Sequence, residues 1–173
     1  MSTPSALARW NALPEAEAVR ELLSCCACRR WAERLVAGRA YATVAELAAA
    51  ADEVWWSLAP DDWLEALSAH PRIGERRGAQ DARGERWSAA EQAATGDMEA
   101  DVGARLAANN RRYEERFGFR FVVRASGRSA TEMLALLEQR LAETDRAAEL
   151  RRAAEQQRQI TRLRLDELME ESR

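Results

Sequence analysis

The chain has 173 residues, of which 47% are hydrophobic and 32% are charged, and this balance predicts a folded globular protein rather than a disordered one. It has no apolar run near the roughly 20 residues of a membrane span and no basic segment followed by an apolar core, so we expect neither a membrane anchor nor a secretory signal. The formal net charge is −3, and the basic residues, all arginines, interleave with glutamates along predicted helices, which indicates solvated helix faces rather than a nucleic-acid surface.

The first half of the chain predicts three helices. Pro14 can open a helix at its first position, and apolar residues at helical spacing continue as far as Gly38. Thr43-Val44-Ala45-Glu46 has the pattern of a capping box and predicts the start of the next helix. A short helix then starts near Pro60 and runs into His70.

The three cysteines, Cys25, Cys26 and Cys28, lie within four residues and have no other cysteine to pair with. They favour a reducing, cytoplasmic location over a disulfide framework. A zinc site would need a further ligand, for which only His70 is available, and a redox motif would need a βαβ context. We therefore expect small buried helix residues and no bound metal.

The second half predicts a glycine-rich loop from Gly74 to Glu85 and then four more helices. Capping boxes begin at Ser88 and Ser129, and a helix from Met98 to Phe117 ends at Gly118. The only strand-like run is 119–124, and the last helix starts near Asp145. The prediction is one all-α domain over residues 1–173, a helical bundle of about seven to nine helices.

His70 is the only histidine in the chain. Its ordinary pKa lies closest to working pH, which makes it the natural proton carrier. Pro71 disfavours the helical conformation at His70, so the imidazole is expected at a helix end where a loop can direct it into a pocket. The alternative is a histidine that only complements the helix dipole.

Arg164 is the second candidate, because on a helical wheel it falls inside the apolar arc between Ile160 and Leu168, whereas Arg162 falls on its margin. An arginine in an apolar stripe needs an anionic partner or a wet cavity. It could bind a carboxylate or a ring carbonyl with its planar guanidinium, or it could form a structural ion pair or extend to solvent.

Ser88, Glu91 and Gln92 form a polar cluster at a predicted helix start. Backbone N–H groups also point outward there, so the cluster could bind a polar ring. Glu91 could equally cap the helix as the fourth residue of its box.

Four sequence blocks resemble those of the 2-oxo-4-hydroxy-4-carboxy-5-ureidoimidazoline (OHCU) decarboxylases. The first is Trp63-Leu64-Glu65-Ala66-Leu67-Ser68-Ala69-His70-Pro71-Arg72-Ile73-Gly74. The other three are Trp87-Ser88-Ala89-Ala90-Glu91-Gln92, Tyr113-Glu114-Glu115-Arg116-Phe117-Gly118-Phe119 and Ile160-Thr161-Arg162-Leu163-Arg164-Leu165. They occur in family order, and the resemblance spans roughly residues 10 to 169.

The resemblance implies an all-helical enzyme that needs no cofactor and converts OHCU to (S)-allantoin in urate breakdown. It makes His70 the catalytic acid/base, and we place Glu91 beside it in the catalytic pair. It assigns substrate binding to a further set of residues, namely Pro71, Ser88, Gln92, Phe119, Val123 and Arg164. We expect a homodimer that binds this small molecule and neither nucleic acid nor membrane.

Two positions depart from the family pattern: Arg120 stands where a proline is familiar, and Ala40 stands for the proline of an Arg-Pro-Phe. Both changes could alter loop rigidity, and neither removes a proposed catalytic side chain. The alternatives to an enzyme are a non-catalytic helical interaction domain that uses the arginine-rich last helix as its contact surface, and a small regulator that binds nucleic acid through that helix.

Overall fold

The structure, a computed structural model, describes residues 5–72, 100–142 and 145–170. These residues contain eight helices and no strand, which confirms the all-α prediction of seven to nine helices for the described part. In chain order they are α1 (Ala6–Ala12), α2 (Glu15–Cys25), α3 (Arg29–Ala37), α4 (Val44–Trp56), α5 (Pro60–Ser68), α7 (Ala100–Phe117), α8 (Ala130–Leu141) and α9 (Arg146–Glu170). Among the described helices, none combines the length and the hydropathy that a membrane crossing requires.

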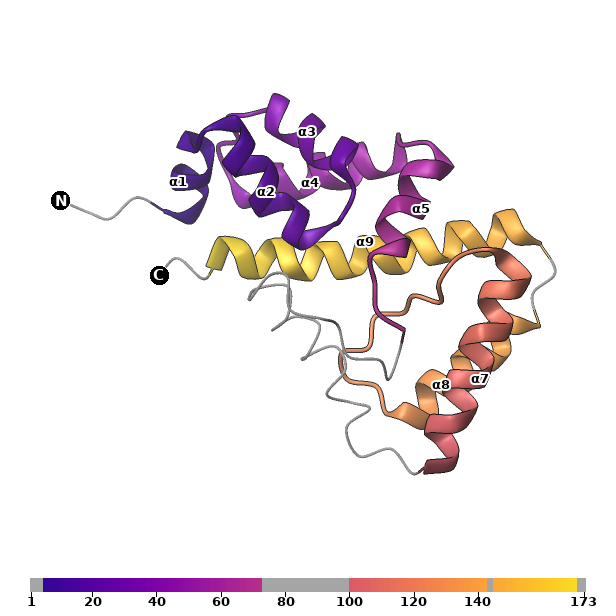
Figure 1. Cartoon of the computed structure of the whole chain (residues 1–173). Coiled ribbons are helices and arrows are strands. Elements are labelled where there is room, and N and C mark those ends of the chain that lie inside the picture. The colour runs from indigo at the N-terminus through magenta and orange to yellow at the C-terminus, as the bar shows by residue number, and fades with distance from the viewer. Residues whose placement is uncertain (1–4, 73–99, 143–144, 171–173) are drawn as a thin grey trace. The chain divides into compact units, whose positions relative to one another are not determined.

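The chain divides into two compact units. The first unit comprises residues 1–66 and 158–173, and the second comprises residues 67–157. Helix α9, drawn from orange to yellow in Figure 1, contributes its first half to the second unit and its second half to the first.

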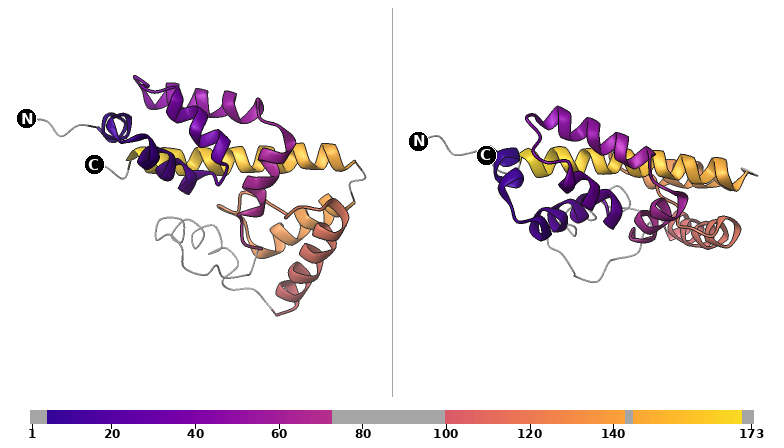
Figure 2. Two further views of the ribbon diagram at one scale, coloured as in Figure 1. Left: turned by 45° about the horizontal axis from the view of Figure 1, so that its top comes forward. Right: turned by 90° about the horizontal axis from the view of Figure 1, so that it is seen from above.

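The first unit is built around tryptophans. Trp31 and Trp55 are almost completely buried, and α2 packs on α3 and α3 on α4 (Figure 2). Buried indole groups need a hydrogen-bond acceptor. The Trp31 Nε1–H donates to the carbonyl of Ala51 at 3.1 Å, and the Trp63 Nε1–H donates to that of Trp55 at 3.0 Å. The tryptophan rings are therefore buried by apolar packing, while backbone carbonyls accept hydrogen bonds from their N–H groups.

The structure corrects the expectation of one helix from Pro14 to Gly38. Cys26 and Cys28 have extended backbone conformations, so α2 ends at Cys25 and α3 begins at Arg29. The thiols are buried as expected, but only Cys25 is helical. Each short helix has helical spacing of its own, but a single continuous helix would place the buried Leu22 and Leu35 about 140° apart around its axis, so the change of phase marks the break. The helix α1, capped by the Ser5 hydroxyl at 3.2 Å, was also not expected.

Tyr41 follows the departure at Ala40 and ties α1 to the turn after α3. Its hydroxyl donates to the Leu35 carbonyl at 3.0 Å, and its ring stacks on Trp10 with 6.3 Å between the ring centroids. A Cβ on Gly38 would lie 2.6 Å from the Tyr41 hydroxyl oxygen. Glycine at this helix end therefore leaves room for the tyrosine hydroxyl, which would have to move to admit a larger residue.

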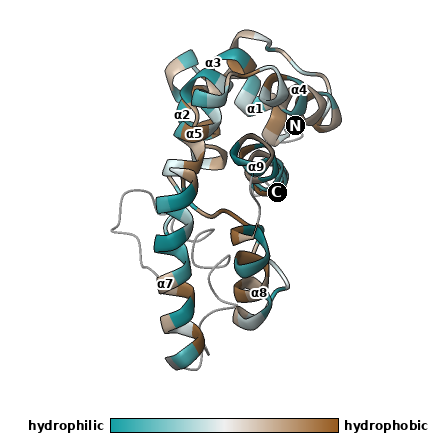
Figure 3. Ribbon diagram, turned by 90° about the vertical axis from the view of Figure 1, so that its right-hand side faces the viewer, coloured by the Kyte–Doolittle hydropathy of each residue, from teal (hydrophilic) through white to brown (hydrophobic). Residues whose placement is uncertain are grey.

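The second unit pairs α7 with α8, which lie side by side in Figure 1. Hydrophilic and hydrophobic residues mix along both helices in Figure 3, as expected for amphipathic helices. The predicted capping box at Ser129 is present with both of its hydrogen bonds. At Thr43 the hydroxyl caps the helix by accepting the Glu46 N–H, but the Glu46 carboxylate accepts the N–H of Ala42 rather than that of Thr43. Gly118 ends α7 with a φ of 77°, a conformation that favours glycine.

Candidate active site

His70 lies just beyond α5, which ends at Ser68, two residues earlier than the sequence predicts. Its backbone N–H still donates to the Leu67 carbonyl at 3.3 Å, and Pro71 then continues the chain outside the helix. His70 and Pro71 are both half-buried. The expectation that the imidazole stands at a helix end is therefore confirmed, with a loop directly after it.

The His70 imidazole contacts Gln157 of α9. Its Nε2 lies 2.5 Å from the Oε1 of Gln157, whose side chain has no exposed surface. Arg120 contacts the main chain of the same residue, because its guanidinium donates to the His70 carbonyl. The side chain and the main chain of His70 thus have separate partners within the second unit.

The segment Phe119–Val123 connects α7 toward α8 without forming a strand. Phe119 and Val123, both predicted to bind substrate, are buried, as is most of the segment. Two side chains hold its backbone: Arg140 donates to the Val122 carbonyl at 2.8 Å, and Gln156 Oε1 accepts the Arg124 N–H at 3.0 Å. A backbone fixed by side chains can present its own polar groups to a ligand.

Arg140 belongs to a buried charge network that sequence reasoning missed. Its Nε lies 2.5 Å from Glu149 Oε1, and the Tyr113 hydroxyl donates to the same carboxylate oxygen. Glu149 has no exposed surface and Arg140 is 5% exposed. Burial is the main cause that raises the pKa of Tyr113 above its ordinary value. The glutamate beside arginines in a helical sequence looks like an ordinary surface residue, so no sequence signal marked it.

Arg72, in the same motif as His70, forms a two-point ion pair with Glu114 of α7. Its Nε and Nη2 each lie 2.8 Å from a different carboxylate oxygen of Glu114. Such a paired geometry fixes direction as well as distance. It fastens the loop after His70 to the helix that leads into the Phe119–Val123 segment.

Arg164 lies in the first unit, on the second half of α9. It is half-buried, inside the buried face formed by Ile160, Leu165 and Leu168, as the helical wheel predicts. Its Nη1 donates to the Cys25 carbonyl at 3.4 Å. Arg162 has a different environment, because its Nε lies 3.2 Å from Asp166 one turn along the helix. The two arginines therefore differ in partner as well as in direction.

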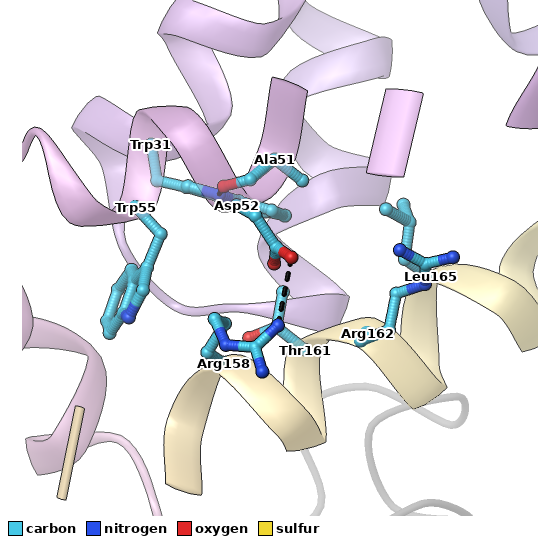
Figure 4. Close-up of a pocket in the computed structure, with 8 residues that line it drawn as sticks. All are labelled: Trp31, Ala51, Asp52, Trp55, Arg158, Thr161, Arg162 and Leu165. Atoms are coloured by element: carbon cyan, nitrogen blue, oxygen red, sulfur yellow. Dashed lines mark hydrogen bonds and ion pairs between the residues drawn. The ribbon is translucent and has the colours of Figure 1, made fainter. Parts of the chain in front are cut away.

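A small cavity in the first unit lies beside Arg162 rather than Arg164 (Figure 4). Asp52 and Arg158 form an ion pair across it at 2.9 Å, and Trp31 and Trp55 line it. Its volume is about 10 Å³, which is room for about one water molecule. Ligand pockets are usually a few hundred Å³ or more, so this cavity is no substrate site.

The cysteines show no features of a reactive site. All three thiols are buried and none forms a disulfide, and burial raises the pKa of Cys28 to about 11. Within the described residues, one group could hold a metal ion, formed by Cys28, Asp62 and Glu65 with ligand atoms within 4.8 Å of one another. The carboxylates of Asp62 and Glu65 already accept backbone N–H groups, and neither His70 nor Cys25 belongs to the group.

Three predicted site residues lie outside the described residues: Ser88, Glu91 and Gln92. Of the predicted site residues that are described, His70, Pro71, Phe119 and Val123 fall in the second unit, and Arg164 falls in the first. Gln157, Arg120 and Arg140 were not predicted, although each contacts a predicted residue or its segment.

Comparison with known proteins gives a consistent result. The sequence model of the OHCU decarboxylase family matches residues 11–166. The uric acid degradation bifunctional protein TTL of Arabidopsis thaliana is 39% identical over 121 residues, which cover 68% of this chain but 37% of that protein. The 2-oxo-4-hydroxy-4-carboxy-5-ureidoimidazoline decarboxylase of Haloferax volcanii is 31% identical over 136 residues, which cover 79% of each chain.

Two crystal structures have similar folds. An OHCU decarboxylase determined in the presence of (S)-allantoin is 33% identical, with a TM-score of 0.75 over 87% of this chain and 97% of that one. An (S)-allantoin synthase is 23% identical, with a TM-score of 0.72 over 94% of this chain and 54% of that one, and this likeness concerns the fold alone.

Proposed function

The chain belongs to the OHCU decarboxylase family, and from that premise we propose that it decarboxylates OHCU to (S)-allantoin. The observation that carries the proposal is the match over residues 11–166, which includes the His70-Pro71-Arg72 motif at the end of α5. The alternative of a non-catalytic interaction domain predicts no such placement of a lone histidine beside a loop.

The chemistry of the substrate explains which groups are needed. One ring carbon carries both the carboxylate and a hydroxyl, and its neighbour is a C=N carbon that bears the ureido group. When the bond to the carboxylate breaks and CO₂ leaves, the electron pair forms a C=C bond with this neighbour, and the C=N pair moves to nitrogen, which takes up a proton. The substrate thus holds its own electron sink, and we propose that the enzyme uses no cofactor.

The enol formed must then become a carbonyl while a proton reaches the neighbouring carbon from one face. We propose His70 as the acid/base for this proton transfer, since a single positioned histidine can serve both directions. Delivery from one face would set the S configuration. Glu91 would act with His70, either by accepting ureido N–H groups or by crowding the leaving carboxylate.

We propose that substrate binding uses Pro71, Phe119, Val123 and Arg164, together with Ser88 and Gln92. Pro71 shapes the pocket wall beside His70, and the buried Phe119–Val123 backbone offers polar groups at a fixed position. The guanidinium of Arg164 suits a carboxylate or a ring carbonyl, and it can stabilise charge that develops on the ring.

We further propose one functional domain over residues 1–173, because the family match crosses both compact units. We propose a homodimer in the cytoplasm that binds neither nucleic acid nor membrane. The buried cysteines form no disulfide, which favours a reducing compartment. Sedimentation equilibrium would test the dimer, and cell fractionation would test the location.

The decisive experiment follows freshly made OHCU spectrophotometrically, with circular dichroism to read the handedness of allantoin. We expect faster decay, an excess of (S)-allantoin and no effect of EDTA. His70→Ala and His70→Asn should each lower turnover by about 10²–10⁴, the usual contribution of a positioned acid/base, while the far-ultraviolet spectrum stays native. Racemic product at the spontaneous rate would refute the proposed reaction, and a folded His70→Ala protein with normal turnover would refute the role of His70.

A further inference from the structure

The contact between His70 and Gln157 is unusual because it joins a half-buried imidazole to a completely buried amide. The two side chains are 87 positions apart in sequence, and their atoms lie 2.5 Å apart. A buried amide is costly unless its polar atoms have partners. Gln157 is therefore placed for a specific hydrogen bond, and that bond is to the only histidine in the chain.

Gln157 acts together with Arg120, which holds the main-chain carbonyl of the same histidine. Arg120 stands where the family pattern has proline, so this chain uses a side-chain contact where a rigid ring is familiar. The neighbouring Gln156 holds the Arg124 N–H at 3.0 Å. Adjacent glutamines of α9 thus fix the histidine and the end of the Phe119–Val123 segment.

We propose that Gln157 is the positioning residue of His70: its Oε1 accepts the Nε2–H and thereby fixes the imidazole as the tautomer whose lone pair lies on Nδ1. This inference rests on the proposed function only for its catalytic consequence, because the tautomer is a property of the protein itself. An amide oxygen selects a tautomer without adding charge, whereas a carboxylate there would favour the imidazolium.

Among the described residues, three charged side chains contact His70 or belong to the ion pair of its motif. Arg120 on the segment after α7 reaches the His70 carbonyl, and Arg72 on the loop after α5 is paired with Glu114 of α7. The opposite charges of Arg72 and Glu114 largely offset each other. A carboxylate introduced at position 157 would therefore be the dominant new charge on the imidazole.

The test is nuclear magnetic resonance of the single histidine in the full-length protein. In the wild type at pH above the imidazole pKa, we expect a pyrrole-type shift for Nε2 and a pyridine-type shift for Nδ1. Gln157→Glu should raise the pKa of His70 by about 1–3 units, as an opposite charge at this distance does. The acidic limb of the pH profile of kcat/KM should move in the same direction. Gln159→Glu, which adds the same charge to α9 about 200° around the helix, is the matched control and should leave the pKa unchanged.

Gln157→Met keeps the length of the side chain and removes the acceptor oxygen, so it should give a mixture of tautomers and lower kcat more than it raises KM. It also decides the question if Gln157→Glu does not fold. A pyridine-type Nε2 in the neutral wild type, or tautomer populations unchanged in folded Gln157→Met, would overturn the proposal. If the wild type has the expected tautomer but does not accelerate OHCU decay, the proposed function fails and the positioning role stands.

Discussion

The two compact units differ in what they bury. Among the described residues, the first unit buries almost only apolar side chains, with Thr161 as its single buried polar residue. The second unit buries several polar residues, and these are Asn109, Asn110, Arg140, Glu149 and Gln157. Apolar interiors tolerate exchanges of similar volume, whereas buried polar groups are stable only with partners at defined positions. Gln157, which contacts His70, belongs to this polar interior.

The largest effect on stability is expected when Glu149 in the polar interior of the second unit is neutralised. Glu149→Gln keeps the shape but leaves the buried Arg140 without its counter-charge, and we expect the free energy of unfolding to fall by about 3–5 kcal/mol. Urea denaturation followed by circular dichroism measures the loss.

Leu22→Met is the matched control in the apolar unit, where a similar-volume exchange at a fully buried position should cost less than about 1.5 kcal/mol. Equal losses in the two variants would mean that the units do not differ in the way their contents indicate.

Arg164 is an exception in the apolar first unit, because it is a half-buried cation. If it binds substrate, Arg164→Ala should lower kcat/KM by about 1.5–3 kcal/mol of transition-state stabilisation, the value of one charge-assisted hydrogen bond. Arg164→Lys should recover only part of the lost kcat/KM, because a point charge cannot replace a planar two-donor group.

The control is Arg162→Ala, which removes an exposed i,i+4 pair with Asp166 and should have a mild effect on kcat/KM. Greater damage from Arg162→Ala than from Arg164→Ala would place the substrate on the other side of α9. Unfolding measured in parallel separates a binding role from a structural one.

The sequence predictions succeeded where a feature depends on residues that are close together in the sequence. The hydroxyl caps at Thr43 and Ser129 and the end of α7 at Gly118 depend on neighbouring residues, and all three are present. The buried face of α9 that contains Arg164 followed from helical periodicity alone. The break at Cys26–Cys28 was missed, because each short helix has helical spacing of its own and only the phase between the two changes.

The partners of the candidate site were beyond sequence reasoning for a different reason. Gln157 meets His70 from 87 positions away, and Glu149 meets Tyr113 from 36 positions away. In sequence, each is one polar residue among many on an arginine- and glutamate-rich helix. Only the fold determines which of these polar residues turns inward. The sequence therefore predicts buried apolar residues of the first unit but not the buried polar residues of the second.

A smaller effect is expected from the buried thiols of the apolar unit, which should make the free energy of unfolding depend on pH. Burial raises the pKa of Cys28 to about 11, whereas an unfolded thiol titrates near 8.5. From about pH 8.5 upward the unfolded chain therefore loses this proton first, and the free energy of unfolding falls as pH rises, by at most about 1.4 kcal/mol per pH unit for one thiol. Below about pH 8.5 the Cys28 thiol keeps its proton in both states, so its contribution to the free energy of unfolding is fully present.

Urea denaturation between pH 8 and 9.5 measures the slope below the range in which ordinary tyrosines ionise. Cys28→Ala should make the slope shallower, since one titrating thiol is gone while Cys26 remains, its own pKa also raised by burial. A slope that is zero in the wild type, or identical in Cys28→Ala, would show that the Cys28 thiol is ionised equally in both states.

The smallest effect is expected for an exposed charge pair in the polar unit. Arg105 and Glu138 join α7 to α8 at 2.8 Å, but their side chains are 52% and 42% exposed. Water and salt screen such a pair, so Arg105→Gln should lower the free energy of unfolding by only about 0.2–1 kcal/mol, and added salt should reduce the difference further. The same denaturation assay measures it beside Glu149→Gln. A loss as large as that of the buried glutamate would mean that charge itself, rather than burial of charge, distinguishes the second unit.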